Sequence, residues 1–254
     1  MLRISSTSRF SSRVQNYARY RPSYPPDVLE VLRHECGLSR DSIVADIASG
    51  TGIFTRLLLE NGNRVFGVEP NPDMRSAGEE YLAGYPKFAS VSGTAEATTL
   101  PDHRVTLITS AQAAHWFDRE KALLEFRRIL CPGGYVALLW NERQVGATAF
   151  GTDYENLLVK YGTDYIELQN QNNGPNEFFP FKCGKRVLNH RQVLEYAALE
   201  GLLLSASYTP QPGEASYAPM LAGLRQIFEQ HQIGGFVRME YETRLYFGQL
   251  SRSD

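Results

Sequence analysis

The sequence has few cysteines, no long apolar run and no excess of positive charge. Its 254 residues include three cysteines, Cys36, Cys131 and Cys183, with no Cys-x-x-Cys pair. This scarcity argues against a disulfide framework, a zinc knuckle or a dithiol redox site. No apolar run approaches the roughly 20 residues needed to span a bilayer, and no signal-peptide core follows the N-terminus. We therefore expect a cytoplasmic protein with reduced thiols and no membrane contact.

The charges nearly balance, with 26 Lys and Arg against 28 Asp and Glu and a net charge of -2. No global positive field recruits nucleic acid, so none is expected as a partner. The five histidines show no metal-ligand spacing, and no metal is expected. At 43% hydrophobic residues the chain can bury a core, either as one large domain or as a domain with an appendage. We expect a monomer or a homodimer.

Strand and helix patterns alternate along the first 142 residues. The expected strands are 42–47, 64–69, 88–92, 105–109 and 135–140, with helical patterns between them. The run YVALLW (135–140) is apolar throughout, as in a strand that is covered on both faces. The pattern predicts an α/β protein with a doubly wound, Rossmann-like sheet of seven strands, mostly parallel.

The second half breaks this pattern. Residues 143–200 are polar and rich in Asn, Gln and Tyr, and we expect a helical insertion there without a strand, followed by a sixth strand over 202–208. The segment VRMEYETRLYF (237–247) alternates strictly, which predicts a half-exposed last strand, antiparallel at the sheet edge. The expected divisions are a lid segment (1–25), a cofactor-binding core (26–142), a helical insertion or substrate cap (143–200) and a C-terminal completion of the sheet (201–254).

Candidate chemistry lies at the carboxyl ends of the strands. The segment ADIASGTG (45–52) follows the first strand, and Gly50 and Gly52 allow a tight turn close to a ligand. Glu69 ends the second strand, 19 residues past Gly50, where an acid accepts both hydrogens of a ribose diol. Asp46, four residues before Gly50, suits a charged amino group. Together these residues indicate an adenosine-bearing cofactor with an ammonium group, as in S-adenosylmethionine.

A dinucleotide is the competing cofactor. Its fingerprint places a third glycine three residues beyond Gly52, where this chain has Thr55. The chain also lacks a Ser, Tyr and Lys set at suitable spacing. A nicotinamide-dependent oxidoreductase is therefore second, and a non-catalytic protein that binds the cofactor for regulation is third.

These motifs resemble those of class I S-adenosylmethionine-dependent methyltransferases of the small-molecule, type 11-like branch. VADIASGTG is similar to the first family motif, GVEPN to the second, SGTAEATTLP (92–101) to the third, and SAQAAHWFD (110–118) takes the fourth position. RVQNYARYRPSYP resembles an N-terminal lid that closes over the methionine end of the cofactor. The residues that this resemblance implies for cofactor binding are Tyr17, Tyr20, Arg21, Asp46, Ala48, Gly50, Gly52, Glu69, Pro70, Asn71, Met74, Ala95, Glu96 and Gln112.

The chain departs from the family at Ala48, which stands where a glycine is usual. We expect Ala48 to keep a negative φ there without strain. At the N-terminus, the first 26 residues contain no acid, five arginines and six serines, as in a transit peptide. The aromatic residues and prolines after Val14 favour a structured segment instead.

His115 and Trp116 follow the fourth strand, where side chains approach the transferred methyl group. His115 is a candidate general base and Trp116 a wall of the acceptor pocket. The structural alternatives are that His115 only caps the next helix and that Trp116 belongs to the core. A similar His-Trp pair occurs in carboxyl methyltransferases, and trans-aconitate methyltransferase looks like a relative. The resemblance therefore favours a small-molecule acceptor methylated on a carboxylate, which needs no base.

Overall fold

The structure, a computed structural model, describes residues 16, 19–170, 178–180 and 183–250. These residues form one seven-stranded sheet in the order β3-β2-β1-β4-β5-β7-β6. Its strands are β1 (Ile43–Ile47), β2 (Arg64–Val68), β3 (Phe88–Val91), β4 (Val105–Ala111), β5 (Leu130–Arg143), β6 (Gly184–Leu194) and β7 (Val237–Gly248). β1 to β5 pair in parallel, and β7 is antiparallel to both of its neighbours. The predicted doubly wound α/β sheet is confirmed.

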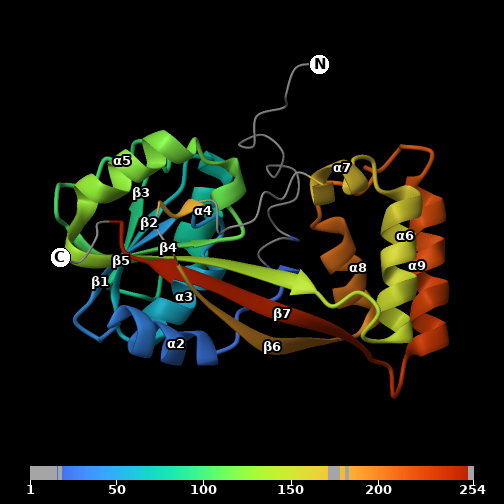
Figure 1. The fold of residues 1–254 in the computed structure, drawn as a ribbon. Helices are drawn as coiled ribbons and strands as arrows, with labels where there is room; N and C mark the ends of the chain where they lie inside the picture. The colour runs from blue at the N-terminus through green and yellow to red at the C-terminus, as the bar shows by residue number, and fades with distance from the viewer. Residues whose placement is uncertain (1–15, 17–18, 171–177, 181–182, 251–254) are drawn as a thin grey trace.

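Helices cover both faces of the parallel part of the sheet (Figure 1). α2 (Asp27–Cys36) and α3 (Ile53–Glu60) pack on one face, and α5 (Arg119–Ile129) packs on the other. Successive side chains of a strand point to opposite faces of the sheet. Val44 of β1 therefore packs in the core shared with α2 and α3, and Ala45 packs in the core shared with α5. α4 (Pro72–Tyr81) follows β2. The strand order reverses between β1 and β4, because successive strands are added on one side of β1 up to β3 and on its other side from β4 onward. Ligands bind at such a reversal in open α/β sheets.

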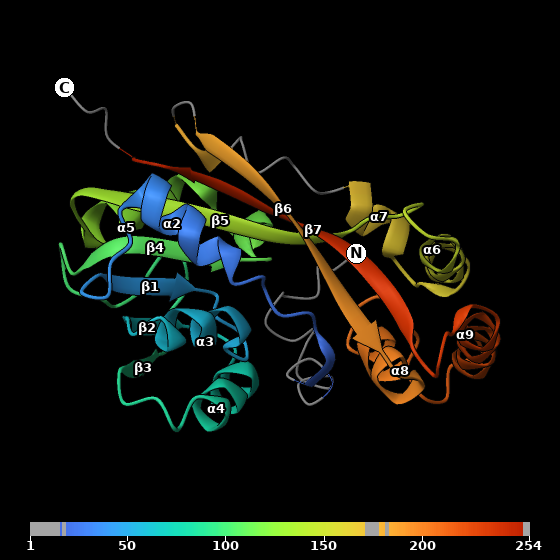
Figure 2. The ribbon, with the colours of Figure 1, turned by 90° about the horizontal axis from the view of Figure 1, so that it is seen from below.

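Four helices form a separate lobe, which we name the helical cap: α6 (Ala149–Tyr161), α7 (Tyr165–Asn170), α8 (Tyr196–Leu204) and α9 (Tyr217–His231). The cap has its own hydrophobic core, distinct from the two cores of the sheet. Figures 1 and 2 show it at the far ends of β5, β6 and β7, which run from the sheet into the cap, with α6 and α9 side by side. Its helices between β5 and β6 confirm the predicted insertion.

Two predictions for residues 143–208 are wrong. The sixth strand is β6 (184–194), inside the region expected to lack a strand, and 202–208 holds the end of α8 and a turn. β6 is an edge strand whose Val187 and Val193 are 46% and 54% exposed, so no apolar pattern marks it. The run Leu202–Leu204 is apolar because α8 is enclosed by the cap core.

β7 alternates as predicted, with Val237, Met239 and Tyr241 buried and Arg238 exposed between them. Its expected place at the sheet edge is wrong, because β6 pairs with it along 11 residues. β7 therefore joins the parallel strands to the edge strand. None of the helices in the described part of the chain combines the length and the apolar content that crossing a bilayer requires.

Candidate active site

A cavity of about 540 Å³ opens at the carboxyl ends of the parallel strands and extends to the helical cap. The loop after β1, the segment after β4 and the end of β5 line it on the sheet side. α6, α7, the turn after α8 and β7 contribute its far side. Its lining includes Arg21, Asp46, Ala48, Gly50, Thr51, Gln112, His115, Trp116, Asn141, Arg143, Glu155, Tyr165, Tyr208 and Tyr241.

The loop between β1 and α3 turns on three residues with positive φ. Ala48, Gly50 and Gly52 have φ of 54°, 57° and 84°. A Cβ atom at Gly52 would lie 2.6 Å from Leu82 Cδ1, so glycine is required there for space as well as for conformation. The expected negative φ of Ala48 is wrong. A left-handed alanine is strained by roughly 1 to 2 kcal/mol, and the loop holds it there.

Glu69 joins this loop to the start of α4. Its Oε2 accepts a hydrogen bond from Gly50 N at 2.9 Å, and its Oε1 accepts one from Asn71 N at 2.8 Å. Burial raises the pKa of Glu69, and these backbone donors oppose that rise. Since each carboxylate oxygen has a second lone pair, both can still accept hydrogens from a diol.

The other predicted residues of this turn support it from behind. Asn71 caps α4, because its Oδ1 accepts from Asp73 N and Met74 N. Met74 is buried, and its Cε would lie 3.4 Å from a Cβ at Gly50. Pro70, between Glu69 and Asn71, is partly buried. Glu69, Pro70, Asn71 and Met74 do not belong to the cavity lining, and Glu69 is joined to it by its hydrogen bond to Gly50. Gly78 of α4 was not predicted, yet a Cβ there would lie 3.1 Å from Gly50 O, so this glycine lets the helix pack on the loop.

Asp46 is a buried carboxylate at the end of β1, with 1% of its surface exposed. Its oxygens accept hydrogen bonds from Thr55 Oγ1 at 2.6 Å and Thr109 Oγ1 at 2.9 Å. Burial raises its pKa to about 6, against the lowering by the two hydroxyls. Nearby, the buried Thr51 Oγ1 has no hydrogen-bond partner among the described residues. Both groups are suited to a polar, cationic ligand group.

The segment Ala95–Glu96 lies beside the cavity rather than in its wall. Ala95 is 4% exposed and belongs to the core under α5. Glu96 Oε1 accepts a hydrogen bond from Asp118 N at 2.9 Å. The predicted contact of both residues with adenine therefore remains a prediction.

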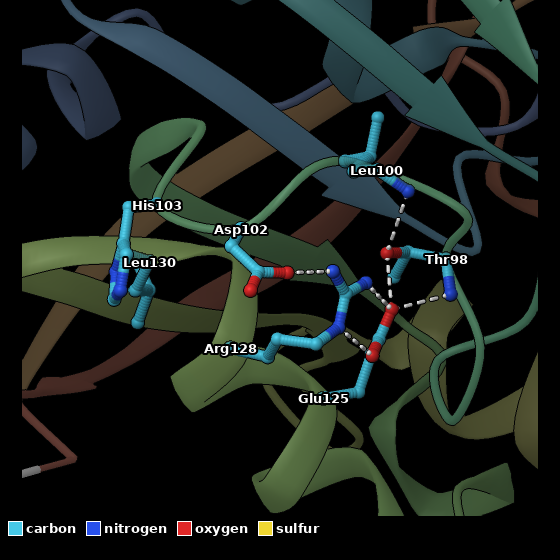
Figure 3. A network of polar contacts seen from close by, with 7 residues as sticks. All are labelled: Thr98, Leu100, Asp102, His103, Glu125, Arg128 and Leu130. Carbon is cyan, nitrogen blue, oxygen red and sulfur yellow. Dashed lines mark hydrogen bonds and ion pairs between the residues drawn. The ribbon is translucent and has the colours of Figure 1, made fainter.

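A charged network fixes this segment to α5 (Figure 3). Thr98 donates through its N and its Oγ1 to Glu125, at 2.8 and 2.5 Å. Arg128 pairs with Glu125 at 2.7 Å and with Asp102 at 2.6 Å. The Arg128 guanidinium and the Thr98 donors lower the pKa of Glu125 to about 2. The network holds the turn two residues beyond Glu96.

The chain leaves β4 through a second strained residue. Gln112 has φ of 61°, its N donates to Leu139 O, and its Nε2 donates to Asn141 O at 2.8 Å. It thus joins the ends of β4 and β5 at the cavity wall. A non-glycine residue held in the left-handed region is a feature that clusters at functional sites.

His115 and Trp116 lie in the short 3₁₀ turn Ala114–Trp116 (η2) and both line the cavity. Their ring centroids are 4.8 Å apart at 45°, and Trp116 is 39% exposed, so it is not a core residue. His115 does not cap α5. Asp118 is the capping residue, because its side chain accepts a hydrogen bond from Lys121 N. The protein around the ring lowers the pKa of His115 to about 4 by desolvation. His115 is partly exposed to solvent, and with its pKa lowered the ring is neutral near pH 7.

The N-terminal segment contacts the cap. Tyr17 lies outside the described residues. Tyr20 packs on α8, because a Cβ at Gly201 would lie 2.1 Å from its ring, and it does not line the cavity. Arg21 does line the cavity, and its Nη2 donates to Ser205 O at 3.3 Å.

The far side of the cavity carries polar residues that were not predicted. Arg143 ends β5, Glu155 lies on α6, Tyr165 begins α7, and Tyr208 follows α8. Arg143 could have been identified from the sequence. It follows Asn141 by two residues at the end of the apolar strand, so both side chains are expected on the same face. The cap residues gave no comparable signal, because their place depends on how the cap folds. No cluster of metal-ligating side chains occurs in the described part of the chain.

Comparison with known proteins bears on this site. Residues 45–138 match the family model of the methyltransferase domain. An uncharacterized methyltransferase of Mycobacterium tuberculosis is 39% identical over 134 residues, which cover 53% of this chain and 52% of that protein. Residues 45–138 are therefore similar to a methyltransferase domain. The match to this relative spans about half of its length.

Solved structures extend the likeness of the fold beyond this domain. A protein of Anaeromyxobacter dehalogenans, described as a type II methyltransferase, superposes with a TM-score of 0.69 at 21% identity, covering 91% of this chain and 98% of that one. An N-methyltransferase of Haemonchus contortus in complex with S-adenosylhomocysteine gives a TM-score of 0.51 at 14% identity, covering 93% of this chain and 56% of that one. The fold is that of class I S-adenosylmethionine-dependent methyltransferases.

Proposed function

We propose that this chain transfers a methyl group from S-adenosylmethionine to a carboxylate oxygen of a small molecule. The observation that carries the proposal is the single cavity that joins the glycine-containing loop to His115, Trp116 and the helical cap. One end offers groups suited to the cofactor, and the other end has room for an acceptor. The cap, including residues 143–200, would then enclose the acceptor, and residues 1–25 would act as the lid.

The residues at the loop end fit the cofactor. Asp46 would face its ammonium group, Glu69 would accept from its ribose hydroxyls, and Thr51 would gain a partner for its buried hydroxyl. The loop backbone at Gly50 and Gly52 allows close approach. Thr55 donates to Asp46 where a dinucleotide fingerprint would need glycine, which favours this cofactor over NAD.

When bound, S-adenosylmethionine supplies a methyl group activated by its sulfonium: a carboxylate oxygen bonds to the methyl carbon as the carbon–sulfur bond breaks, and the electron pair stays on sulfur. A carboxylate acceptor arrives deprotonated, so no residue has to remove a proton. The task of the protein is then to hold the acceptor close and aligned, which contributes on the order of 7 to 11 kcal/mol.

The pKa of His115 supports this type of acceptor. A histidine whose pKa lies well below 6.5 is a weak base for a hydroxyl or an ammonium group near pH 7. The neutral ring also adds no positive charge next to a sulfonium. We infer that His115 and Trp116 position the acceptor, with the Trp116 ring as a wall of its pocket.

The test is methyl transfer from labelled S-adenosylmethionine to a panel of carboxylic acids, alcohols and amines. We expect label in the acids, released as methanol by mild alkali, because methyl esters hydrolyse whereas methyl ethers and methylamines do not. Glu69→Ala should abolish most of the transfer. Glu79→Ala, a change on α4 at a side chain 50% exposed, is the control and should retain it.

Three outcomes would contradict parts of this proposal. Label that resists alkali would exclude the carboxylate acceptor and leave methyl transfer standing. Tight binding of the cofactor without transfer to any acceptor would favour a regulatory protein. Binding of a dinucleotide in place of S-adenosylmethionine would favour an oxidoreductase.

A further inference from the structure

The cap end of the cavity contains an arginine with only partial hydrogen bonding. Arg143 Nη2 donates to Tyr165 OH at 2.8 Å, but its other contacts are long: 3.3 Å to Glu155 Oε2 and 3.4 Å from Nη1 to Tyr208 OH. Charge-assisted hydrogen bonds are usually about 2.7 to 2.9 Å. The buried Nε has no partner among the described residues. Arg143 therefore retains hydrogen-bonding capacity at a cavity wall, where 19% of its side chain is exposed.

Aromatic side chains surround this guanidinium. Its Cζ lies 5.6 Å from the ring centroid of Tyr154 and 5.9 Å from that of Tyr165. Tyr241 lies opposite Arg143 in the pairing of β5 with β7. Burial raises the pKa of Tyr165, and it raises that of Tyr241 to about 12. Both hydroxyls stay protonated near pH 7, so they are neutral donors and do not cancel the charge of Arg143.

A second arginine and two glutamates belong to this end of the cavity. Arg21 lines the same cavity and acts electrostatically on Tyr154 and Tyr241, which places its charge near that of Arg143. Glu155 is the carboxylate among these lining groups, and it shares its second oxygen with Tyr165 OH. The other cavity-lining acid nearby, Glu142, pairs with Arg244 at 2.5 Å. Arg244 also pairs with Glu242 at 2.9 Å, so it is shared between two carboxylates. Among the described lining residues of this end, Arg143 keeps a buried Nε without a hydrogen-bond partner.

The spacing along β5 relates this charge to the reacting end. Gln112 bonds to Asn141 at the wall that His115 and Trp116 share. Arg143 lies two residues farther along the strand, so its Cα is roughly 7 Å beyond that of Asn141. Residues two apart in a strand point to the same face, so both side chains reach the same side of the sheet.

From these observations we propose that Arg143 binds a second anionic group of the acceptor, remote from the oxygen that is methylated. The acceptor is then a small dianion, such as a dicarboxylate, with its charges separated by several carbon atoms. This inference rests on the proposed function and specifies its substrate class. Its energetic basis is that a ligand carboxylate can form the short, bidentate contact that Glu155 does not form with Arg143.

The test measures binding rather than turnover. S-adenosylhomocysteine is first titrated into the protein by calorimetry, and glutarate, adipate and pimelate are then titrated with and without it, each beside its diamide. We expect at least one diacid to bind 10-fold or more tightly than its diamide. Arg143→Met should weaken that binding by about 10- to 100-fold, the loss expected for a charged hydrogen-bonded contact. Arg143→Lys should lose less, because it keeps the charge.

A second variant is expected to bind diacids more tightly, a result that unfolding of the protein could not produce. Glu155→Gln keeps the shape of the side chain and removes the competing carboxylate, so diacid binding should tighten by roughly 3- to 10-fold. Arg186→Met, which removes an arginine of β6 that does not line the cavity and pairs with Glu35, is the matched control and should leave diacid affinity unchanged.

The results separate this inference from the function on which it rests. If S-adenosylhomocysteine binds but diacids and diamides bind equally, or neither binds at millimolar concentration, the role of Arg143 is wrong and methyl transfer stands. Diacid binding that is unchanged in Arg143→Met, or weakened in Glu155→Gln, overturns it equally. If S-adenosylhomocysteine itself fails to bind, the proposed function fails first.

Discussion

The two ends of the cavity are built in different ways. At the loop end the backbone fixes the geometry: Glu69 accepts from the N–H groups of Gly50 and Asn71, and three residues of the loop hold positive φ. At the cap end side chains fix it, through Arg143, Glu155 and several tyrosine hydroxyls. The loop end is suited to a ligand common to many proteins, whereas the cap end is suited to a particular acceptor.

The extent of the family match agrees with this difference. The match to the methyltransferase-domain model covers residues 45–138, which include Asp46, Glu69 and His115. Arg143 and the cap residues of the cavity lie after it. A backbone-built site tolerates sequence change around it, because its donors belong to every residue type except proline. A site built from side chains changes with each substitution, so it distinguishes one relative from another.

Loss of Glu69 should be the largest effect at the loop end. Glu69→Ala removes the acceptor for the ribose hydroxyls and also releases the N–H groups of Gly50 and Asn71. We expect S-adenosylhomocysteine to bind more weakly by about 2 to 4 kcal/mol. Calorimetry on the variant and on Glu79→Ala measures this. Equal affinities would show that the geometry of this end does not depend on Glu69, and the contrast between the ends would weaken.

Asp46→Asn should raise stability while it lowers cofactor affinity. The folded pKa of Asp46, about 6, lies above the usual 3.8. Stability associated with the protonated acid is therefore complete below about pH 4 and is lost as the pH rises through 6, by roughly 2 to 3 kcal/mol. The amide has no such loss, so the variant should be more stable than the wild type at pH 7.5 and nearly equal at pH 4.

The two readouts for Asp46 are urea unfolding at these pH values and calorimetry with S-adenosylhomocysteine. We expect affinity to fall at least 10-fold in Asp46→Asn, because the ammonium group loses its charged partner. In the wild type, affinity should also decline below pH 6 as the carboxylate is protonated. A variant that is less stable at pH 7.5 would mean that the hydroxyls of Thr55 and Thr109 compensate for burial of the charge.

The same contrast explains what the sequence could predict. β1, β4 and β5 carry mainly apolar, buried runs because helices cover both faces of the sheet there, and the loop motif follows directly from β1. Asp46, Gly50, Gly52 and Glu69 were therefore predictable, and the structure brings them together. β6 was missed because it is an edge strand with exposed valines, and α8 was mistaken for a strand because it is apolar on several sides.

The cap end could not be predicted for a related reason. Four separate segments supply Arg143, Glu155, Tyr165 and Tyr208, namely β5, α6, α7 and the turn after α8, and tertiary packing brings them together. No spacing in the sequence predicts that these four segments lie together. The left-handed φ of Ala48 and Gln112 was also missed, since local preference places both residues elsewhere and the surrounding loops override it.

His115 lies between the two ends, and its substitution should have a moderate effect. If it positions a carboxylate acceptor, His115→Gln should raise KM by several-fold with kcat within about 10-fold of the wild type. Because its pKa lies below 6.5, kcat/KM should show no histidine transition between about pH 6 and 8. A loss in kcat of about 100-fold or more, with a transition near pH 6 to 7, would make it a general base and the acceptor a protonated group.

The smallest effect is expected at Ala48, where backbone strain can be measured alone. Ala48→Gly should stabilise the protein by about 0.5 to 1 kcal/mol, because glycine adopts φ near 54° without the cost that Cβ imposes, and its extra freedom in the unfolded chain offsets part of that gain. Ser49→Gly is the matched control: Ser49 is not among the described residues with positive φ, so the same change should destabilise by a similar amount. Urea unfolding of both variants gives the comparison. If Ala48→Gly destabilises as Ser49→Gly does, then the loop does not store strain at this position, and the loop end is held by its hydrogen bonds alone.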